Sequence, residues 1–301
     1  MPTAHGRGAL AETPGSDAVQ SGPTALRLLV GAQLRRLREA RGITREDAGY
    51  AIRGSSSKIS RMEGGRTSFK PRDIADLLTL YGVAEEAERQ ALLALAEQAN
   101  APNWWQDYRE AVPEWFVAYL GLEQDAALIR AYEVQFVPGL LQTEDYARAV
   151  IAQRHKGDSE WQIDQRVAVR LRRQRILAAP GSRKLWAVLD EAALHRRVGS
   201  PEIMRAQLEH LGRMAESPHI TVQVVPFDSG STAGGVGPVT ILRFAQAELR
   251  DVVYLEQLTS AQYLTKATDV LPYQQLMDEL GVSAAPSTAT PAILRQVIDA
   301  L

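Results

Sequence analysis

Apolar residues in the first hundred positions recur with the spacing of short amphipathic helices. The first stripe consists of Leu26, Val30, Leu34 and Leu37, and arginines occupy many of the positions between them. Gly42 follows the stripe and is expected to end this helix. The pattern therefore predicts a helix whose apolar face packs against the segments that follow.

Two further short helices are predicted directly after it. Thr44 has the position of an N-cap, and Asp47 three residues later is its capping-box partner, so a second helix is expected from about Arg45 to Ile52. Ser55 has the position of the next N-cap, and Gly54 breaks the chain before it. Small residues in the second helix allow the third to cross closely, at about 90–120°.

The faces of the third helix that do not pack inward carry hydroxyl and basic side chains. Such donors suit phosphate oxygens and base edges in a major groove of DNA. We predict DNA contacts from Arg45, Ser55, Ser56, Ser57, Lys58, Ser60, Arg61 and Arg66. Glu63 is the exception in this segment, and we interpret it as a structural partner of Arg35 or Arg38 in the first helix.

Residues 34–65 resemble the XRE/Cro family of helix-turn-helix regulators. The matching positions are Thr44, Ser55, Ile59, Ser60, Glu63 and Gly65, with Met62 in place of the usual isoleucine. Arg45, Gly49 and Arg53 depart from the family pattern, which has glutamine, alanine and a turn glycine there. The resemblance implies binding to double-stranded DNA, with Arg45 as a phosphate clamp where the family has its glutamine contact.

Basic charge is concentrated in this segment. Residues 26–83 contain twelve Lys and Arg against six Asp and Glu. The whole chain has 34 basic and 36 acidic residues and a formal net charge of −2. A basic island in an acidic chain is typical of a phosphate-binding surface, although arginine-rich helices also occur as solvated faces.

The helical pattern continues to about residue 100, where a domain boundary is expected. Pro71 opens a fourth helix that Gly82 closes, and a fifth is predicted over about residues 85–100. We therefore assign residues 26–101 to an all-α DNA-binding domain and residues 102–301 to a second domain. Residues 1–25 are rich in small residues and proline and are expected to form a flexible tail, not a signal peptide.

The second domain mixes helical and strand patterns. Residues 127–137 are interpreted as a strand or a helix-to-strand passage, and residues 161–178 as an arginine-rich helix. Strands are predicted over residues 185–189, 220–226, 238–244 and 252–258, and a closing helix over residues 264–280. Helices separate the early strands and the later ones are adjacent, so we predict an α+β domain with a mainly antiparallel sheet.

Three features of this domain admit more than one interpretation. The aromatic cluster over residues 104–119 is either packing or the lining of a ligand pocket. The arginines of residues 166–175 either bind acidic partners or DNA or, as is usual for such a helix, mostly face solvent. The glycine-rich residues 229–237 lack a P-loop lysine, so a mobile strand connection is favoured over a phosphate cradle.

The sequence offers no catalytic or metal-binding constellation. It contains no cysteine, which excludes disulfides, thiolate metal sites and cysteine nucleophiles. Its five histidines are scattered, without metal-ligand spacing, so no cofactor is expected. No apolar run reaches the roughly 18 residues of a membrane span. We expect a cytoplasmic protein that is not an enzyme.

The second domain also resembles a known type. Its phrases VPGLLQTEDYARAV (137–150), LWAVLDEAALHRRVG (185–199), ITVQVVPF (220–227) and VVYLEQLT (252–259) are similar to the C-terminal domain of WhiJ-like actinobacterial regulators. That resemblance implies a domain of poorly defined role and pairing with a small BldB-like protein partner. Because one reader contacts few base pairs, we expect a homodimer on a pseudo-palindromic operator. The alternative is a sensor that binds a small molecule in this domain.

Overall fold

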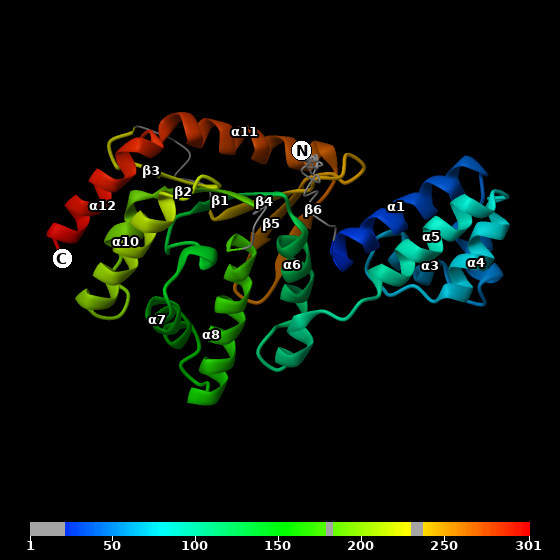
Figure 1. Ribbon diagram of the computed structural model, residues 1–301, viewed down its shortest axis with the longest axis horizontal. Helices are drawn as coiled ribbons and strands as arrows, with labels where there is room; N and C mark the ends of the chain where they lie inside the picture. The colour runs from blue at the N-terminus through cyan, green and yellow to red at the C-terminus, as the bar shows by residue number, and fades with distance from the viewer. Residues whose placement is uncertain (1–21, 179–182, 230–236) are drawn as a thin grey trace, which may run out of the picture.

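The computed structural model describes residues 22–178, 183–229 and 237–301. A helical unit, called the reader below, lies at one end of the molecule, and a larger unit built around a sheet forms the rest (Figure 1). Most of the tail predicted over residues 1–25 lies outside the described residues. Helix α1 begins within that range, at Pro23, because proline fits the first helical position, where no amide hydrogen is needed.

Five helices build the reader, and their predicted apolar stripes are buried together. The helices are α1 (Pro23–Ala40), α2 (Arg45–Ala51), α3 (Ser56–Glu63), α4 (Pro71–Leu80) and α5 (Glu86–Ala99). Val30, Leu34, Ile59 and Met62 lie in one apolar core, as the periodicity predicts. Gly42 and Gly82 both have positive φ angles after helices, which glycine adopts without steric cost.

The second unit is a sheet domain with short strands and longer helices. Before and between its first strands lie η1 (Trp104–Tyr108), α6 (Glu114–Asp125), β1 (Leu128–Glu133), η2 (Gly139–Leu141), α7 (Glu144–Arg154), α8 (Glu160–Gln174), η3 (Arg175–Leu177), β2 (Lys184–Asp190), α9 (Glu191–His195) and α10 (Pro201–Ala215). Then follow β3 (Ile220–Val225), β4 (Val239–Arg243), β5 (Val252–Glu256), β6 (Ala261–Leu264), α11 (Ala267–Ser283), η5 (Ser287–Ala289) and α12 (Thr290–Asp299).

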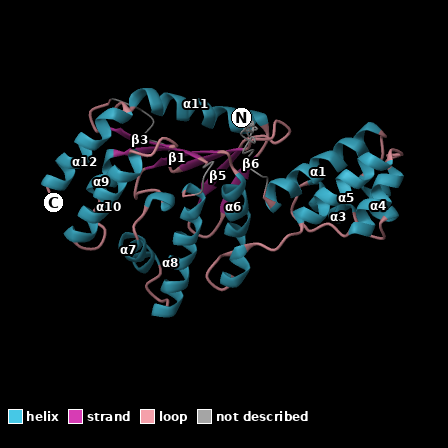
Figure 2. Ribbon diagram, viewed as in Figure 1, coloured by secondary structure: helices cyan, strands magenta, loops and turns pink. Residues whose placement is uncertain are grey.

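The six strands form one mixed sheet in the order β3-β2-β1-β4-β5-β6. Strands β1, β2 and β3 pair in parallel, and β1–β4, β4–β5 and β5–β6 pair antiparallel. Helices α6, α7, α8 and α10 lie on one face, here called the helical face, and α11 covers the other (Figures 1 and 2). The predicted α+β domain with a mainly antiparallel sheet is confirmed.

The sequence pattern missed one strand. Residues 261–264 form β6 and pair with β5, so the closing helix begins at Ala267 and not at Leu264 as predicted. The strand is short, and its side chains are half-buried or exposed, so it lacks the apolar alternation that marks a buried strand.

The prediction that α8 mostly presents a solvated arginine face is wrong. The side chains of Arg166, Arg170 and Arg173 are half-buried and bond to other elements, whereas Arg175 is exposed. These three arginines are spaced at helical intervals and therefore share one face of α8. Their partners lie before α8, before α6, after η2 and in α6; they are Asp158, the Ala111 carbonyl, Gln142 and Glu123.

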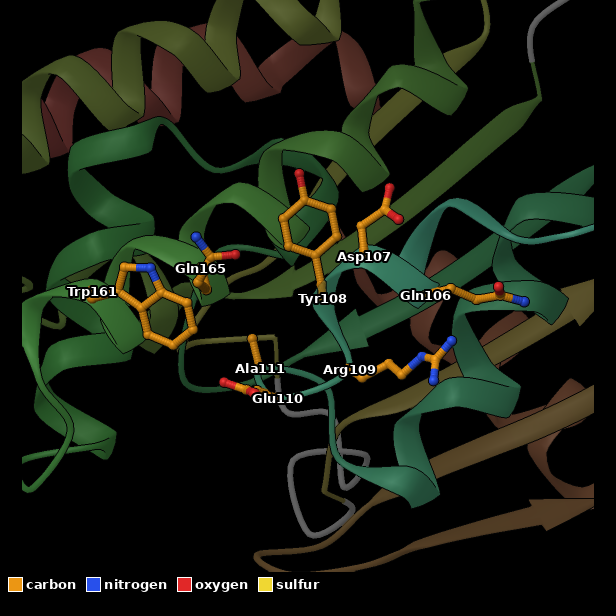
Figure 3. Close-up of a pocket in the computed structure, with 8 residues that line it drawn as sticks. All are labelled: Gln106, Asp107, Tyr108, Arg109, Glu110, Ala111, Trp161 and Gln165. Carbon is orange, nitrogen blue, oxygen red and sulfur yellow. The ribbon is translucent and has the colours of Figure 1, made fainter.

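The aromatic segment is mainly packing. Trp105 and Leu120 are buried in a small apolar cluster, and Trp104 contacts Trp105 edge to face at 5.6 Å between ring centroids. A hollow of 310 Å³ lies beside it, lined by residues 106–111, Trp161 and Gln165 (Figure 3). Of the aromatic cluster itself, only Tyr108 lines this hollow, so most of the cluster does not form a pocket wall.

The reader and the sheet domain meet where α1 begins. Gly22, the N-cap of α1, has no side chain to cap the helix, and the Ala25 amide instead donates a 2.6 Å hydrogen bond to Oδ2 of Asp125 at the end of α6. A Cβ at Gly121 would lie 2.0 Å from Oγ1 of Thr24, so only glycine permits this approach. The first turn of α1 is therefore fixed to α6.

Candidate DNA-binding interface

Helices α2 and α3 begin at the predicted N-caps. The Thr44 hydroxyl accepts a 3.1 Å hydrogen bond from the Asp47 amide and donates one of 2.7 Å to the Asp47 carboxylate. The Ser55 hydroxyl accepts a bond of 3.3 Å from the Lys58 amide. These bonds satisfy amides that have no partner within the helices, and they fix where each helix starts.

Two of the departures from the XRE/Cro pattern have structural explanations. A Cβ at Gly49 would lie 2.9 Å from the carbonyl carbon of Ser55, so glycine lets α2 and α3 cross closely. Arg53 has a φ of 53°, and it is the one non-glycine residue with positive φ in the described part of the chain. It occupies the position where the XRE/Cro pattern has glycine. Glycine adopts this backbone conformation without steric cost, whereas in other residues it is strained.

Glu63 is the centre of a buried ion-pair group in the reader. Its Oε1 accepts a 2.5 Å hydrogen bond from Nε of Arg38, and its Oε2 accepts one of 3.0 Å from Nε of Arg45. Arg38 is the first-helix partner, whereas Arg35 pairs with Glu39 on the surface. The hydrogen bond that Arg38 donates to Glu63 raises the pKa of Arg38 above its usual value. Glu63 thus connects α1, α2 and α3.

Two of the predicted basic DNA contacts are paired with carboxylates inside the reader. Arg45 belongs to the Glu63 group, and Nζ of Lys58 lies 2.5 Å from Oδ2 of Asp73 in α4. The Lys58 side chain retains 28% of its exposure and that of Asp73 only 10%. Both cations are therefore partly neutralised by carboxylates from elements that follow them in the chain.

The other predicted contacts include most of the accessible donors of this region. Ser55, Ser57, Arg61 and Arg66 are exposed. Ser56 and Ser60 are half-buried. Within the described ranges, the guanidinium groups of Arg61 and Arg66 make no hydrogen bond or ion pair with other side chains. They are cations held beside α3 and available to an external anion.

Two exposed residues near α3 were missed by the sequence prediction. Tyr50, at the end of α2, keeps 87% of its exposure, and Arg53 in the following turn is exposed and without an ion pair among the described residues. A large aromatic residue on an otherwise polar helix face was the signal for Tyr50. Beside a recognition helix, an aromatic ring stacks on sugars or bases and an arginine binds phosphates.

The described residues hold no group of three or more His, Cys, Asp or Glu that would bind a metal ion. Nor does any described helix have the length and apolar character needed to cross a membrane. The geometry that remains is a short helix with free cations and hydroxyls on one side and a packed apolar stripe on the other. An arrangement of this kind fits the major groove of DNA.

Comparison with known proteins identifies both parts of the chain. A family model described as a helix-turn-helix domain matches residues 29–92. A second model, described as a domain of unknown function (DUF5753), matches residues 116–296. No curated protein and no solved structure matches the chain. The first match supports a DNA-binding regulator, and, because the second covers more than half of the chain, the protein belongs to the DUF5753 family.

Proposed function

We propose that this protein is a sequence-specific transcriptional regulator of the cytoplasm that inserts α3 into the major groove and has no enzymatic activity. The observation that carries the proposal is the pair of free, exposed guanidinium groups of Arg61 and Arg66 beside a correctly capped helix-turn-helix. Guanidinium groups of this kind bind guanine edges or phosphates. Arg45 and Lys58 contribute mainly by holding the reader together.

A DNA-binding titration tests this proposal. A genome-wide pull-down supplies the operator, and fluorescence anisotropy over a salt series measures the affinity of wild type and Arg61→Ala. Loss of a phosphate contact should reduce the salt slope by about one, and loss of a base contact should cost about 1–3 kcal/mol and relax specificity at one position. Arg36→Ala, which removes an exposed arginine of α1, is the matched control. Equal binding by Arg61→Ala and wild type would exclude α3 as the recognition helix.

The regulator should act as a homodimer on a pseudo-palindromic operator. One reader spans few base pairs, and paired readers enter successive major grooves about 34–36 Å apart. Light scattering tests this. The full chain is used, because the first turn of α1 packs on α6 and truncation at residue 101 would remove that contact. A strictly monomeric chain at the concentration that saturates the operator would contradict it.

The sheet domain is the proposed regulatory part. Its sequence phrases support the narrower assignment to WhiJ-like regulators, with a small BldB-like protein as partner. Through the contact between Asp125 and α1, a molecule bound to the sheet domain would change the position of the reader. A small-molecule effector is the second candidate, and a cluster of charged side chains on the helical face of the sheet favours it.

A further inference from the structure

A group of charged side chains gathers on the helical face of the sheet, far from α3 in the sequence. The register pairs Ala131 of β1 with Thr240 of β4, and Thr240 with Tyr254 of β5. Glu133 and Glu256, each two residues further along, therefore lie level with one another on the same face. Two strand spacings, about 9–10 Å, separate their backbones.

Helix α8 adds two cations to this cluster, and they differ in their partners. Arg173 forms two 2.8 Å hydrogen bonds to the carboxylate of Glu123 in α6 and lies over the ring of Tyr119. Arg170 donates a 2.8 Å bond to the neutral side-chain oxygen of Gln142. Arg173 is thus paired with a carboxylate, whereas Arg170 forms no ion pair with any described residue.

The two glutamates differ in the same way. Glu256 accepts hydrogen bonds from the Tyr254 hydroxyl at 3.0 Å and from Nη1 of Arg154 at 2.9 Å. Glu133 makes no hydrogen bond or ion pair with the residues that the structure describes. An acid and a base in one cluster, both without an ionic partner, are characteristic of a site that a ligand completes.

The charge of the cluster indicates what kind of ligand fits. Burial and the carboxylate of Glu256 raise the pKa of Glu133 to about 8, against the opposing effect of the two α8 arginines. Tyr146 of α7 also interacts with Glu133. Near neutral pH, Glu133 therefore carries a proton and offers a hydrogen-bond donor, not a negative charge.

With Glu133 protonated, the cluster has one positive charge in excess. The cluster contains the guanidinium groups of Arg154, Arg170 and Arg173 and two carboxylates that accept bonds from them, those of Glu123 and Glu256. Arg170 bonds to the neutral Gln142 and to no carboxylate of the described residues, and burial and the charge of Arg173 lower its pKa to about 10. A single negative charge beside Arg170 would relieve this cost.

We propose that Arg170 and Glu133 form a binding site for a small molecule with one carboxylate group, held between β1, β5 and α8. The guanidinium of Arg170 binds one carboxylate face through parallel N–H groups, and Glu133 donates an O–H bond to an oxygen of the ligand. A phosphate dianion is disfavoured, because Glu256 lies in the same cluster and the excess charge is only one.

Helix α6 joins this site to the reader. It carries Glu123, the partner of Arg173, and two residues later Asp125, which caps α1. If the proposed DNA-binding function holds, occupancy of the site changes operator affinity through α6. Ligand binding itself is measured without DNA, so failure of one proposal is distinguishable from failure of the other.

Thermal melting and calorimetry of the full chain test the site. The probes are acetate, butyrate and benzoate, compared with inorganic phosphate and chloride at matched ionic strength. We expect at least one carboxylate to raise the melting temperature and Arg170→Gln to weaken its binding about 30-fold or more. Arg175→Gln, which removes an exposed arginine just after α8, should bind like wild type. Circular dichroism verifies that each variant is folded.

A pH series gives a second test that needs no Arg170 variant. Above the pKa of Glu133 its proton is lost, so carboxylate affinity should fall about tenfold for each further pH unit. Glu133→Gln keeps a donor at this position and should remove that dependence. Stabilisation by phosphate alone, binding that survives in folded Arg170→Gln, or affinity independent of pH in wild type would each overturn the proposal.

Discussion

The reader and the sheet domain both bury charged side chains, but they leave them in different states. In the reader, Glu63 is bonded to Arg38 and Arg45, and Asp73 is bonded to Lys58. In the sheet domain, Glu133 has no partner among the described residues, although Arg173 nearby is paired twice with Glu123. The reader thus joins its buried carboxylates to cations, whereas the sheet domain contains closed pairs and, beside them, Glu133 and Arg170 without ionic partners among the described residues.

Paired charges stabilise the fold, whereas charges without an ionic partner are available to bind a ligand. A closed buried pair is strongly destabilising to break, because the remaining charge is left without a partner in a medium of low polarity. A half-buried charge without an ionic partner is a cost already present in the folded chain, and neutralising it relieves that cost. The comparison therefore predicts opposite responses to substitution in the two units.

The largest effect is expected at the most completely closed group. Glu63→Ala leaves Arg38 buried without its carboxylate and should lower the free energy of unfolding by about 3 kcal/mol. Urea denaturation of the full chain measures this. Glu46→Ala, an exposed acid of α2, should cost less than about 1 kcal/mol. An unchanged denaturation curve together with altered base preference would make Glu63 a DNA-recognition residue instead.

A smaller loss is expected from the half-exposed pair. Lys58→Ala leaves the buried carboxylate of Asp73 unpaired and should cost about 1–2 kcal/mol of stability. Its effect on operator affinity should be smaller than that of Arg61→Ala, because Lys58 is engaged within the reader. Lys70→Ala provides the control from an exposed site. A stable Lys58→Ala variant that loses DNA binding would reverse the roles of the two residues.

Asp125 combines a bonded and an unbonded carboxylate oxygen. One of its oxygens caps α1, and the other is buried without a hydrogen bond. Burial raises its pKa to about 6, so the folded state binds more protons than the unfolded state and stability falls as pH rises from about 4 to 6. Asp125→Asn keeps an oxygen for Ala25 and should gain about 1 kcal/mol at neutral pH, with no gain below pH 4. Identical pH profiles of variant and wild type would show that this carboxyl is not strained.

The reader was predictable because its determinants are local. The N-caps Thr44 and Ser55 act within one turn, and the apolar stripes repeat within single helices. The sequence left two partners open for Glu63, and the structure selects Arg38, which follows the buried Leu34 by one turn on the packed face of α1. Even the strained turn at Arg53 was visible as a departure from the glycine pattern.

The charged cluster of the sheet domain was not predictable in this way. Glu133 and Glu256 lie level on one face of the sheet because β4 pairs with both of their strands, and that register could not be read from the sequence. The helical spacing of the α8 arginines was visible, but their burial depends on Glu123 and Gln142 from earlier segments. A long-range arrangement of this kind requires the fold to be known.

One measurement tests the comparison most directly. The free energy of unfolding of Glu63→Gln and Glu133→Gln is measured at about pH 9, where the unfolded state favours ionised glutamate and the raised pKa of Glu133 costs the folded state most. Glu63→Gln should be less stable than wild type and Glu133→Gln more stable, by about 1 kcal/mol or more. Destabilisation of both variants would show that Glu133 belongs to a closed structural pair and would contradict this account.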